Sequence, residues 1–343
     1  FIPVEGTPRK LVHRIESGRL DSLPGSKQEY ISWEEQRRQV EGMLGAARKV
    51  AMQYSPLNAI PYVSLVDAGT VELVRRLGKE VMSSADLVQL FEACWSAEQL
   101  EMHRAAGRLV DQTMQGAFAR IREFASAGKS LTEYDLQQWI LGQFESQGLM
   151  TDDAPIVAVN ESSGNPHYEP SRERTRPIRR DDWVLLDLWA KLKKPAAVYY
   201  DITWVGYVGT KPPERHQGIF TIVKEARDRA VEFVGNARRR RDRVRGFEVD
   251  DLARRIIRDH GYADWFLHRT GHSIGTEIHS TGANMDNLET HDDREIIART
   301  CFSIEPGIYL PDFGVRLEVN VYADEGDAWV TGRVQNDIVC ILG

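Results

Sequence analysis

The chain has 343 residues, of which 42% are hydrophobic and 28% charged, and its formal net charge is −7. These values are typical of a globular protein with a sizeable core, and the acidic balance favours neither nucleic acid nor an anionic membrane as a partner. No apolar run approaches the roughly 20 residues of a membrane-spanning helix. The three cysteines lie far apart in the sequence, which indicates a reducing compartment and a cytoplasmic protein.

The first 95 residues predict a small α/β domain. Apolar patterns and turn residues indicate two strands and two helices, over residues 49–54, 60–64, 33–48 and 69–77. No cluster of catalytic residue types occurs here, so we expect a structural or oligomerisation domain over residues 1–95. Because the first residue is Phe1 rather than Met, we also expect this domain to be truncated.

Residues 96–343 contain a weak internal repeat. A long helical pattern, a glycine and a second helical pattern occur over residues 97–144, and the same order returns over residues 215–260. Each pair of helical patterns is followed by β-type sequence. The repeat predicts two similar helix–strand halves around a shared centre.

Four carboxylates lie in apolar surroundings where strands are expected. Asp187 follows Val-Leu-Leu, Asp201 follows two tyrosines, and Glu305 and Glu318 lie in the stretch from Phe302 to Val321. We expect each pair of acids to belong to one hairpin. A carboxylate buried among apolar residues is costly unless a positive charge offsets it. One neighbouring arginine cannot offset four carboxylates, so the pattern predicts a bound cation.

Three histidines occur within twelve residues, at positions 268, 272 and 279. Gly271 and Gly275 flank His272 and allow the backbone to approach other groups closely. Four carboxylates and one imidazole favour Mn²⁺, Co²⁺, Fe²⁺ or Zn²⁺ in a two-metal centre over a structural zinc site. A water between ions about 3.5–4 Å apart becomes a nucleophile near neutral pH. The residues therefore predict a dinuclear metallohydrolase with an unspecified substrate.

The order Asp, Asp, His, Glu, Glu resembles the pita-bread metallopeptidases, which include methionine aminopeptidase, aminopeptidase P and prolidase. The matching phrases are Tyr-Asp-Ile-Thr at 200–203, Gly-His-Ser-Ile-Gly at 271–275, Ile-Glu-Pro-Gly-Ile-Tyr at 304–309 and Val-Arg-Leu-Glu at 315–318. The resemblance implies an α+β pita-bread catalytic domain with duplicated halves over residues 96–343. It also implies, more loosely, a creatinase-like α/β domain over residues 1–95.

The resemblance assigns five metal ligands, Asp187, Asp201, His272, Glu305 and Glu318. Asp201 and Glu318 would bridge two divalent ions, with manganese favoured over cobalt, zinc and iron. Asp187 would bind one ion, and His272 and Glu305 the other. Glu305 would also be the proton shuttle of the reaction.

Four further residues match positions that contact the substrate. His279 would donate a hydrogen bond to the scissile carbonyl, and His268 and His167 would lie near the scissile bond, with His268 also counted among the catalytic residues. Arg316 would orient the neighbouring glutamate and the substrate.

The resemblance implies a cytoplasmic homodimer that hydrolyses the Xaa-Pro bond of proline-containing peptides, foremost as an Xaa-Pro dipeptidase (prolidase). The alternative is an Xaa-Pro aminopeptidase acting on longer peptides. A non-catalytic binding module is disfavoured because all five ligand positions are kept. Trp189 and Trp204 depart from the family pattern, and the segment between Asp187 and Asp201 is longer than usual, so these positions affect the expected shape of the pocket.

Overall fold

The computed structural model describes all 343 residues, which form two units. The first unit comprises Phe1–Pro56 and Tyr62–Ser84, and the second comprises Leu57–Pro61 and Ala85–Gly343. Helices and strands occur in both units, as expected for the α+β class. None of the helices combines the length and the apolar character that crossing a membrane requires.

The first unit has two parallel strand pairs and two helices. Strand β1 (Arg9–His13) pairs with β2 (Ser26–Tyr30), and β3 (Lys49–Met52) pairs with β4 (Glu80–Ser83). The helices are α1 (Trp33–Leu44) and α2 (Ala68–Arg76), and a short 3-10 turn, η1, covers Arg14–Glu16. Leu44, Val50 and Val74 form a small buried core.

The prediction of a strand over residues 60–64 is wrong. Pro61–Val63 forms a 3-10 turn, η3, which is separated by two residues from another short turn, η2 (Pro56–Asn58). Pro61 has no backbone N–H to donate to a neighbouring strand and its φ angle is fixed, so it favours a turn over the interior of a sheet.

The second unit contains one short helix and two pairs of longer ones. The short helix is α3 (Ala85–Glu92), and the pairs are α4 (Ala97–Ser126) with α5 (Glu133–Ser146), and α6 (Glu214–Arg240) with α7 (Gly246–Asp259). Capping boxes begin α4 at Ser96 and α5 at Thr132. Helix α6 ends at Arg240, because Arg241 adopts a left-handed conformation with φ 62°.

Two sheets follow the helix pairs along the chain. The first has the order β15-β8-β7-β5, with β6 also paired to β7, and the second has the order β14-β13-β10-β9. The strands of the first sheet are β5 (Leu149–Met150), β6 (Ile156–Val159), β7 (Trp183–Leu192), β8 (Tyr200–Tyr207) and β15 (Val339–Cys340). Those of the second are β9 (Ser273–Ile274), β10 (Thr300–Ile304), β13 (Val319–Ala323) and β14 (Ala328–Val330). A separate hairpin joins β11 (Gly307–Tyr309) to β12 (Gly314–Arg316), and short 3-10 turns η4 and η5 cover Asn160–Gly164 and Ala263–Trp265.

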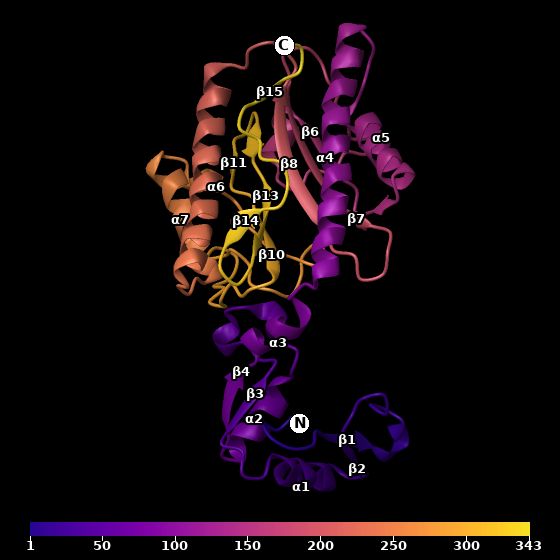
Figure 1. The fold of residues 1–343 in the computed structure, drawn as a ribbon, viewed down its shortest axis with the longest axis vertical. Coiled ribbons are helices and arrows are strands. Elements are labelled where there is room, and N and C mark those ends of the chain that lie inside the picture. The colour runs from indigo at the N-terminus through magenta and orange to yellow at the C-terminus, as the bar shows by residue number, and fades with distance from the viewer. The chain divides into compact units, whose positions relative to one another are not determined.

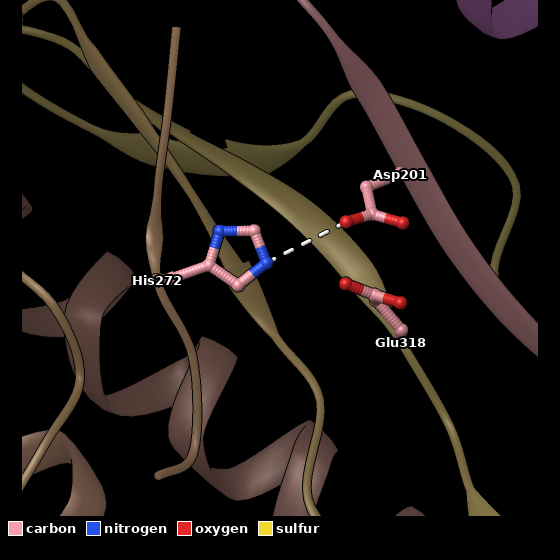
Figure 2. Close-up of side chains that lie close together, drawn as sticks. All are labelled: Asp201, His272 and Glu318. Carbon is pink, nitrogen blue, oxygen red and sulfur yellow. Dashed lines mark ion pairs between the residues drawn. The ribbon is translucent and has the colours of Figure 1, made fainter. Parts of the chain in front are cut away.

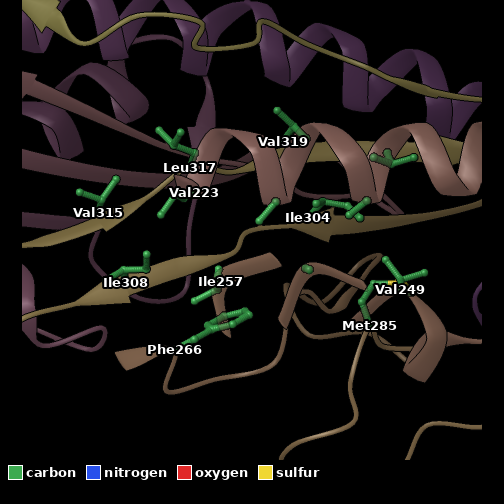
Figure 3. Close-up of a cluster of buried hydrophobic side chains, with 14 of the residues drawn as sticks. Val223, Val249, Ile257, Phe266, Met285, Ile304, Ile308, Val315, Leu317 and Val319 are labelled. Carbon is green, nitrogen blue, oxygen red and sulfur yellow. The ribbon is translucent and has the colours of Figure 1, made fainter. Parts of the chain in front are cut away.

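Each helix pair covers strands of its own half, and the strands lie between the long helices α4 and α6 (Figure 1). In the first half, Met114 of α4 and Ile140 of α5 share a buried cluster with Leu186 of β7 and Ile202 of β8. In the second half, the cluster in Figure 3 joins the helices α6 and α7 to β10, β11, β12 and β13. The helix–strand duplication expected from the sequence is therefore present in the second unit.

The registers of the strands place the four carboxylates in two different ways. Asp187 on β7 is opposite Thr203, and Asp201 on β8 is opposite Trp189, so the two aspartates are diagonal neighbours on one face of the sheet. Ile304 of β10 is opposite Val319 of β13. Glu305 therefore lies just after this last residue pair and Glu318 just before it.

The prediction that Glu305 and Glu318 lie inside strands is wrong. Strand β10 ends at Ile304, and Glu318 lies in the connection between β12 and β13. The amide of Glu305 donates to the carbonyl of Thr270 (2.7 Å), and the amide of Glu318 donates to the carbonyl of Thr203 (3.2 Å). Since both amides bond to other segments, the ladder between β10 and β13 stops where the two carboxylates begin.

Candidate metal centre

A cavity of about 480 Å³ in the second unit brings together every site residue that the sequence suggested. These residues come from strands, strand ends and loops of both halves, and they are His167, Asp187, Asp201, His268, His272, His279, Glu305, Arg316 and Glu318. The cavity therefore lies where the two halves meet.

Three of these residues form a compact group of metal-ligating atoms. Asp201 on β8, His272 just before β9 and Glu318 just before β13 are buried, and each offers one ligand atom within 4.8 Å of the others. His272 Nε2 lies 3.5 Å from Asp201 Oδ2. Figure 2 shows the three side chains pointing toward one another from separate segments of the chain.

The other two acids lie beside this group. Glu305 Oε1 is 3.4 Å from His272 Nε2, on the side of the imidazole that also faces Asp201. Asp187 forms a buried ion pair with Arg316 Nη2, and Arg316 Nε lies 4.0 Å from Glu305 Oε2. Arg316 thus pairs with two of the four acids, which leaves most of their negative charge without a cationic side chain.

The unpaired atoms of the site fit divalent cations. Asp187 Oδ1, Asp201 Oδ1 and Glu318 Oε1 are buried and have no hydrogen-bond partner. A buried acceptor left without a partner destabilises the fold by about 1–3 kcal/mol, and more if it is charged. Carboxylate oxygens together with one imidazole nitrogen are suitable ligands for Mn²⁺, Co²⁺, Fe²⁺ or Zn²⁺. The residues present therefore match the cation that the sequence pattern requires.

The pKa values of the four carboxyl groups reflect the excess of buried acidic groups over basic ones at this site. Burial raises the pKa of Asp187 to about 6 and that of Asp201 to about 7, although the positive charge of Arg316 opposes both shifts. Burial also raises the pKa of Glu305 and that of Glu318, and in Glu318 repulsion from Asp201 adds to the effect. Without cations, protonation of these carboxyl groups is thus easier than in water, and bound cations would favour the ionised forms.

Side chains that the sequence interpretation missed hold the ligands in place. The side chain of Asn320 accepts from the amide of Asp201 (3.1 Å) and donates to its carbonyl (2.7 Å). Thr203 Oγ1 donates to Glu318 Oε2 (2.8 Å), and Ser303 Oγ donates to Glu305 Oε1 (3.0 Å). Each of these three residues lies two positions from a metal-ligating candidate. Where the backbone is extended, this spacing places its side chain on the same face as that candidate, and it is the feature of the sequence that could have indicated these residues.

His268 belongs to a hydrogen-bonded chain beside the metal-ligating group. Its Nδ1 lies 2.7 Å from the carbonyl of Arg269, so this nitrogen carries the hydrogen, and Nε2 accepts from the hydroxyl of Tyr309 (2.6 Å). Arg316 Nη1 donates to the same hydroxyl (3.1 Å). Burial lowers the pKa of His268 to about 3, which keeps this imidazole neutral.

His279 lies edge-on to His272, with ring centroids 4.3 Å apart. The pKa of His279 is lowered to about 3, chiefly because a positive charge on this ring and one on the adjacent His272 ring would repel each other; burial adds to the effect, and the positive charge of Arg269 contributes. His279 is therefore neutral at physiological pH. A neutral imidazole retains one N–H, which can donate to a carbonyl oxygen in the cavity.

His167 reaches the cavity from a loop after η4. Its amide donates to Asn165 Oδ1 (3.1 Å). The hydroxyl of the next residue, Tyr168, donates to Glu133 Oε2 (2.7 Å), and Glu133 is fully buried at the start of α5. The loop that carries His167 is thus anchored to the helix layer of the first half.

Known proteins resemble this chain in both sequence and fold. Residues 101–325 match the model of metallopeptidase family M24. An Xaa-Pro dipeptidase of Pyrococcus furiosus is 31% identical over 262 residues, which cover 76% of this chain and 69% of that protein. A putative Xaa-Pro aminopeptidase of Mycoplasma pneumoniae is 28% identical over 233 residues, covering 67% of this chain and 61% of the relative.

A solved structure extends the likeness to the whole fold. The dipeptidase PepE from Mycobacterium ulcerans superposes with a TM-score of 0.66 and 23% identity, over 98% of this chain and 84% of that structure. The expected pita-bread fold is confirmed by neighbours of this kind. The family match covers both helix–strand halves and the whole cavity, and the chain therefore belongs to metallopeptidase family M24.

Proposed function

We propose that this metallopeptidase is an Xaa-Pro dipeptidase that uses two divalent metal ions, foremost manganese. The observation that carries the proposal is the group formed by Asp201, His272 and Glu318, in which buried carboxylate oxygens have no hydrogen-bond partner. The name of the relative from Pyrococcus furiosus supports the choice of substrate.

The five candidate ligands would share two ions. By the family resemblance, Asp201 and Glu318 would be shared between the two ions, and each has a buried oxygen without a hydrogen-bond partner that is available for a metal. Asp187 would bind one ion through its free Oδ1, and His272 and Glu305 would bind the other. When bound, the ions would lower the pKa of a water and polarise the scissile carbonyl.

The chain's own side chains would handle the protons and the charge of the reaction. Glu305 Oε1 lies 3.4 Å from His272 Nε2 at the edge of the metal-ligating group, so its carboxylate would accept a proton from the attacking water and deliver it to the nitrogen of the leaving proline. His279 would donate its N–H to the carbonyl oxygen as negative charge develops there. Arg316 would fix Asp187 and the Tyr309 hydroxyl, and through that hydroxyl it would orient His268 toward the substrate.

The wall of the cavity has an apolar part that suits a small peptide. Ile156, Trp189 and Ile278 line it together with Pro166. Trp189 stands where related enzymes often have glycine, and its bulk is expected to limit the size of the residue before proline. His167 would contact the substrate from the loop on this side.

The same resemblance is the basis for further proposals about the whole protein. We propose that it works as a homodimer in the cytoplasm and that residues 1–95 form a creatinase-like accessory domain. An Xaa-Pro aminopeptidase is the alternative activity, and the name of the Mycoplasma pneumoniae relative supports it.

Hydrolysis of Ala-Pro and of Ala-Pro-Ala, each with added Mn²⁺, Co²⁺ or Zn²⁺, tests the proposal. We expect release of alanine from Ala-Pro, with Mn²⁺ the best activator and with the tripeptide a poor substrate. Faster cleavage of the tripeptide would identify an aminopeptidase instead. Cleavage of neither peptide with any of the three metals would contradict the Xaa-Pro assignment.

A further inference from the structure

Strand β8 has an edge that no other strand covers over most of its length. On one side it pairs with β7 along the whole of Tyr200–Tyr207. On the other side, β15 reaches only the last two residues of β8. Every second residue of β8 directs its N–H and C=O groups toward this side, and Asp201, Thr203 and Val205 are such residues. Buried peptide groups need hydrogen-bond partners, so other parts of the chain must supply them here.

Side-chain amides of the second half take the place of the missing strand. Asn320 bonds in this way to both the amide and the carbonyl of Asp201. Gln335 does the same four residues further along β8, where its Oε1 accepts from the amide of Val205 (2.9 Å) and its Nε2 donates to the carbonyl of Val205 (2.6 Å). Between these contacts, the amide of Glu318 donates to the main chain of β8. A carboxamide has an acceptor and donors, as a peptide group has, so it can complete the edge of a strand.

The main chain at Gln335 is fixed by a buried cation that none of the roles assigned above uses. Arg227 of helix α6 is 1% exposed, and its Nη1 donates to the carbonyl of Gln335 (2.8 Å). The charge of Arg227 is paired with that of Asp228, whose Oδ1 lies 2.6 Å from Arg227 Nη2. The side chain of Gln335 is buried too, and its Nε2 also donates to the carbonyl of Asp337 (3.0 Å). Helix α6, the C-terminal segment and β8 are therefore linked by buried hydrogen bonds.

These contacts determine how β8 lies against the second half. Asp201 lies four residues before Val205 on β8, and Thr203, whose hydroxyl donates to Glu318 Oε2, lies two residues before it. A strand that slips by one residue turns every side chain to its opposite face. Pairing with β7 fixes β8 only within the first half, because β7 belongs to that half. The side-chain amides at the two ends of this edge therefore keep the two proposed bridging ligands, one from each half, opposite each other.

Resting on the metal ions proposed above, we infer that Gln335 is a positioning residue for the metal centre. Gln335 does not line the cavity, and it acts through β8. Without its carboxamide, the amide and the carbonyl of Val205 lose their partners, and β8 is held to the second half near the site only through Asp201 and Thr203. All five candidate ligands would remain, but Asp201 would be less firmly placed opposite Glu318. The affinity for metal would therefore fall although no ligand is removed.

The test replaces Gln335 by methionine, which is similar in length but forms neither hydrogen bond. Calorimetric titration of metal-free Gln335→Met with Mn²⁺ should give an affinity about 10-fold weaker than that of the unmodified protein, at the lower end of the range for groups that orient metal ligands. Two manganese ions that share bridging ligands give a coupled EPR spectrum, and at saturating Mn²⁺ the variant should show a smaller fraction of coupled pairs.

Gln89→Met is the matched control. Gln89 on α3 is likewise a buried glutamine that donates to a main-chain carbonyl, that of Glu295 (3.0 Å), and neither of these residues lines the cavity. Gln89→Met should therefore bind Mn²⁺ as the unmodified protein does. Urea unfolding of the metal-free proteins shows whether each variant is folded.

Unchanged Mn²⁺ affinity in folded Gln335→Met, or an equal loss in Gln89→Met, would overturn the role of Gln335 while the peptidase assignment stands. If Gln335→Met does not fold, Arg227→Lys decides, because it keeps Gln335 and the positive charge but not the guanidinium that donates to the Gln335 carbonyl. Weaker Mn²⁺ binding is then expected, and unchanged binding would overturn the role. If the unmodified protein binds no Mn²⁺, or binds it without a coupled pair, the two-metal assignment itself is overturned, and the role of Gln335 falls with it.

Discussion

Thr203 and Glu318 are joined by two hydrogen bonds across the boundary between the two halves. Thr203 Oγ1 donates to Glu318 Oε2 (2.8 Å), and the amide of Glu318 donates to the carbonyl of Thr203 (3.2 Å). The first contact fixes one oxygen of the carboxylate, and the other, Oε1, is buried without a hydrogen-bond partner. The threonine thereby orients a proposed bridging ligand without being a ligand itself.

Thr203→Val should weaken metal binding. Valine has the shape of threonine but cannot donate to Glu318 Oε2 or accept from Arg316 Nε, which lies 3.0 Å from the hydroxyl. Loss of a group that orients a metal ligand typically weakens metal affinity about 10- to 100-fold. Calorimetric titration of the metal-free protein with Mn²⁺ measures the change. Thr203→Ser, which keeps the hydroxyl, should retain most of the affinity, and equal affinity in the valine variant would show that the contact is not needed.

His279→Ala should lower turnover while the metal content stays unchanged. The imidazole is neutral and touches His272 only through its ring, so its removal takes away a carbonyl donor and not a ligand. Removing one such donor typically lowers kcat about 10²- to 10³-fold. Metal analysis of the purified variant is the check, because loss of metal would mean that His279 helps to hold the ions.

Glu133→Gln should destabilise the protein and raise KM. The carboxylate accepts from the amides of Val159 (2.8 Å) and Arg176 (2.7 Å) and from the hydroxyl of Tyr168 (2.7 Å). An amide side chain presents N–H groups to one of these donors, so we expect a loss of about 1–3 kcal/mol in the free energy of unfolding.

The KM effect of Glu133→Gln should follow from the loop that carries His167, whose neighbour Tyr168 would lose its anchor. Urea unfolding and KM for Ala-Pro measure the two effects. Exposed Glu161→Gln serves as the control. Unchanged stability in Glu133→Gln would show that the buried carboxylate does not anchor this loop.

His103 should make the protein less stable as the pH falls from about 6.5 to 4. Burial lowers the pKa of this histidine from 6.5 to about 4, and its ring nitrogens are bonded to the carbonyl of Tyr199 and to the hydroxyl of Thr331, both at 2.6 Å. Between these pH values the unfolded chain binds a proton that the folded chain does not, so acid favours unfolding. The effect is on the order of 3 kcal/mol.

The pH dependence of unfolding in His103→Gln isolates this contribution. Measured on metal-free protein, the stability of the variant should fall less steeply between pH 6.5 and 4 than that of the unmodified protein. The pKa values of the buried carboxyl groups of the metal site are raised, so these groups make the folded protein more stable as the pH falls. Both proteins contain these groups, so their contribution cancels when the two stability curves are subtracted. Exposed His260→Gln should keep the original slope. Parallel curves for His103→Gln and the unmodified protein would contradict the assignment.

The sequence was sufficient to find the candidate ligands but not the side chains that hold them. Asp187 and Asp201 stood out because acids in apolar strands need a partner, and this reasoning involves only local sequence. Asn320 holds Asp201 from 119 residues away, and Thr203 is 115 residues from Glu318. The two-residue spacing places each of these side chains on the same strand face as a ligand, but the ligand to which it bonds depends on how the two halves meet, which a local pattern does not encode.

The ends of the strands were predicted less well for a related reason. The apolar residues around Glu305 and Glu318 resemble continuous strands, but the amides of both glutamates bond to Thr270 and Thr203 in other segments. The helix pairs were predicted well because their apolar periodicity and their glycine stops are local features. Tertiary hydrogen bonds therefore decide where the strands end at the site, whereas local pattern decides the helices.

The number of metal ions bound per chain tests the central claim most directly. The metal-free protein is equilibrated with Mn²⁺, freed of excess ion and analysed for metal, beside Asp201→Asn and Glu318→Gln, each of which replaces one proposed bridging carboxylate. The account predicts close to two ions per unmodified chain, with metal and Ala-Pro hydrolysis both lost in the two variants while their circular dichroism is unchanged. No bound metal in the unmodified chain, or full hydrolysis by either variant, would contradict it.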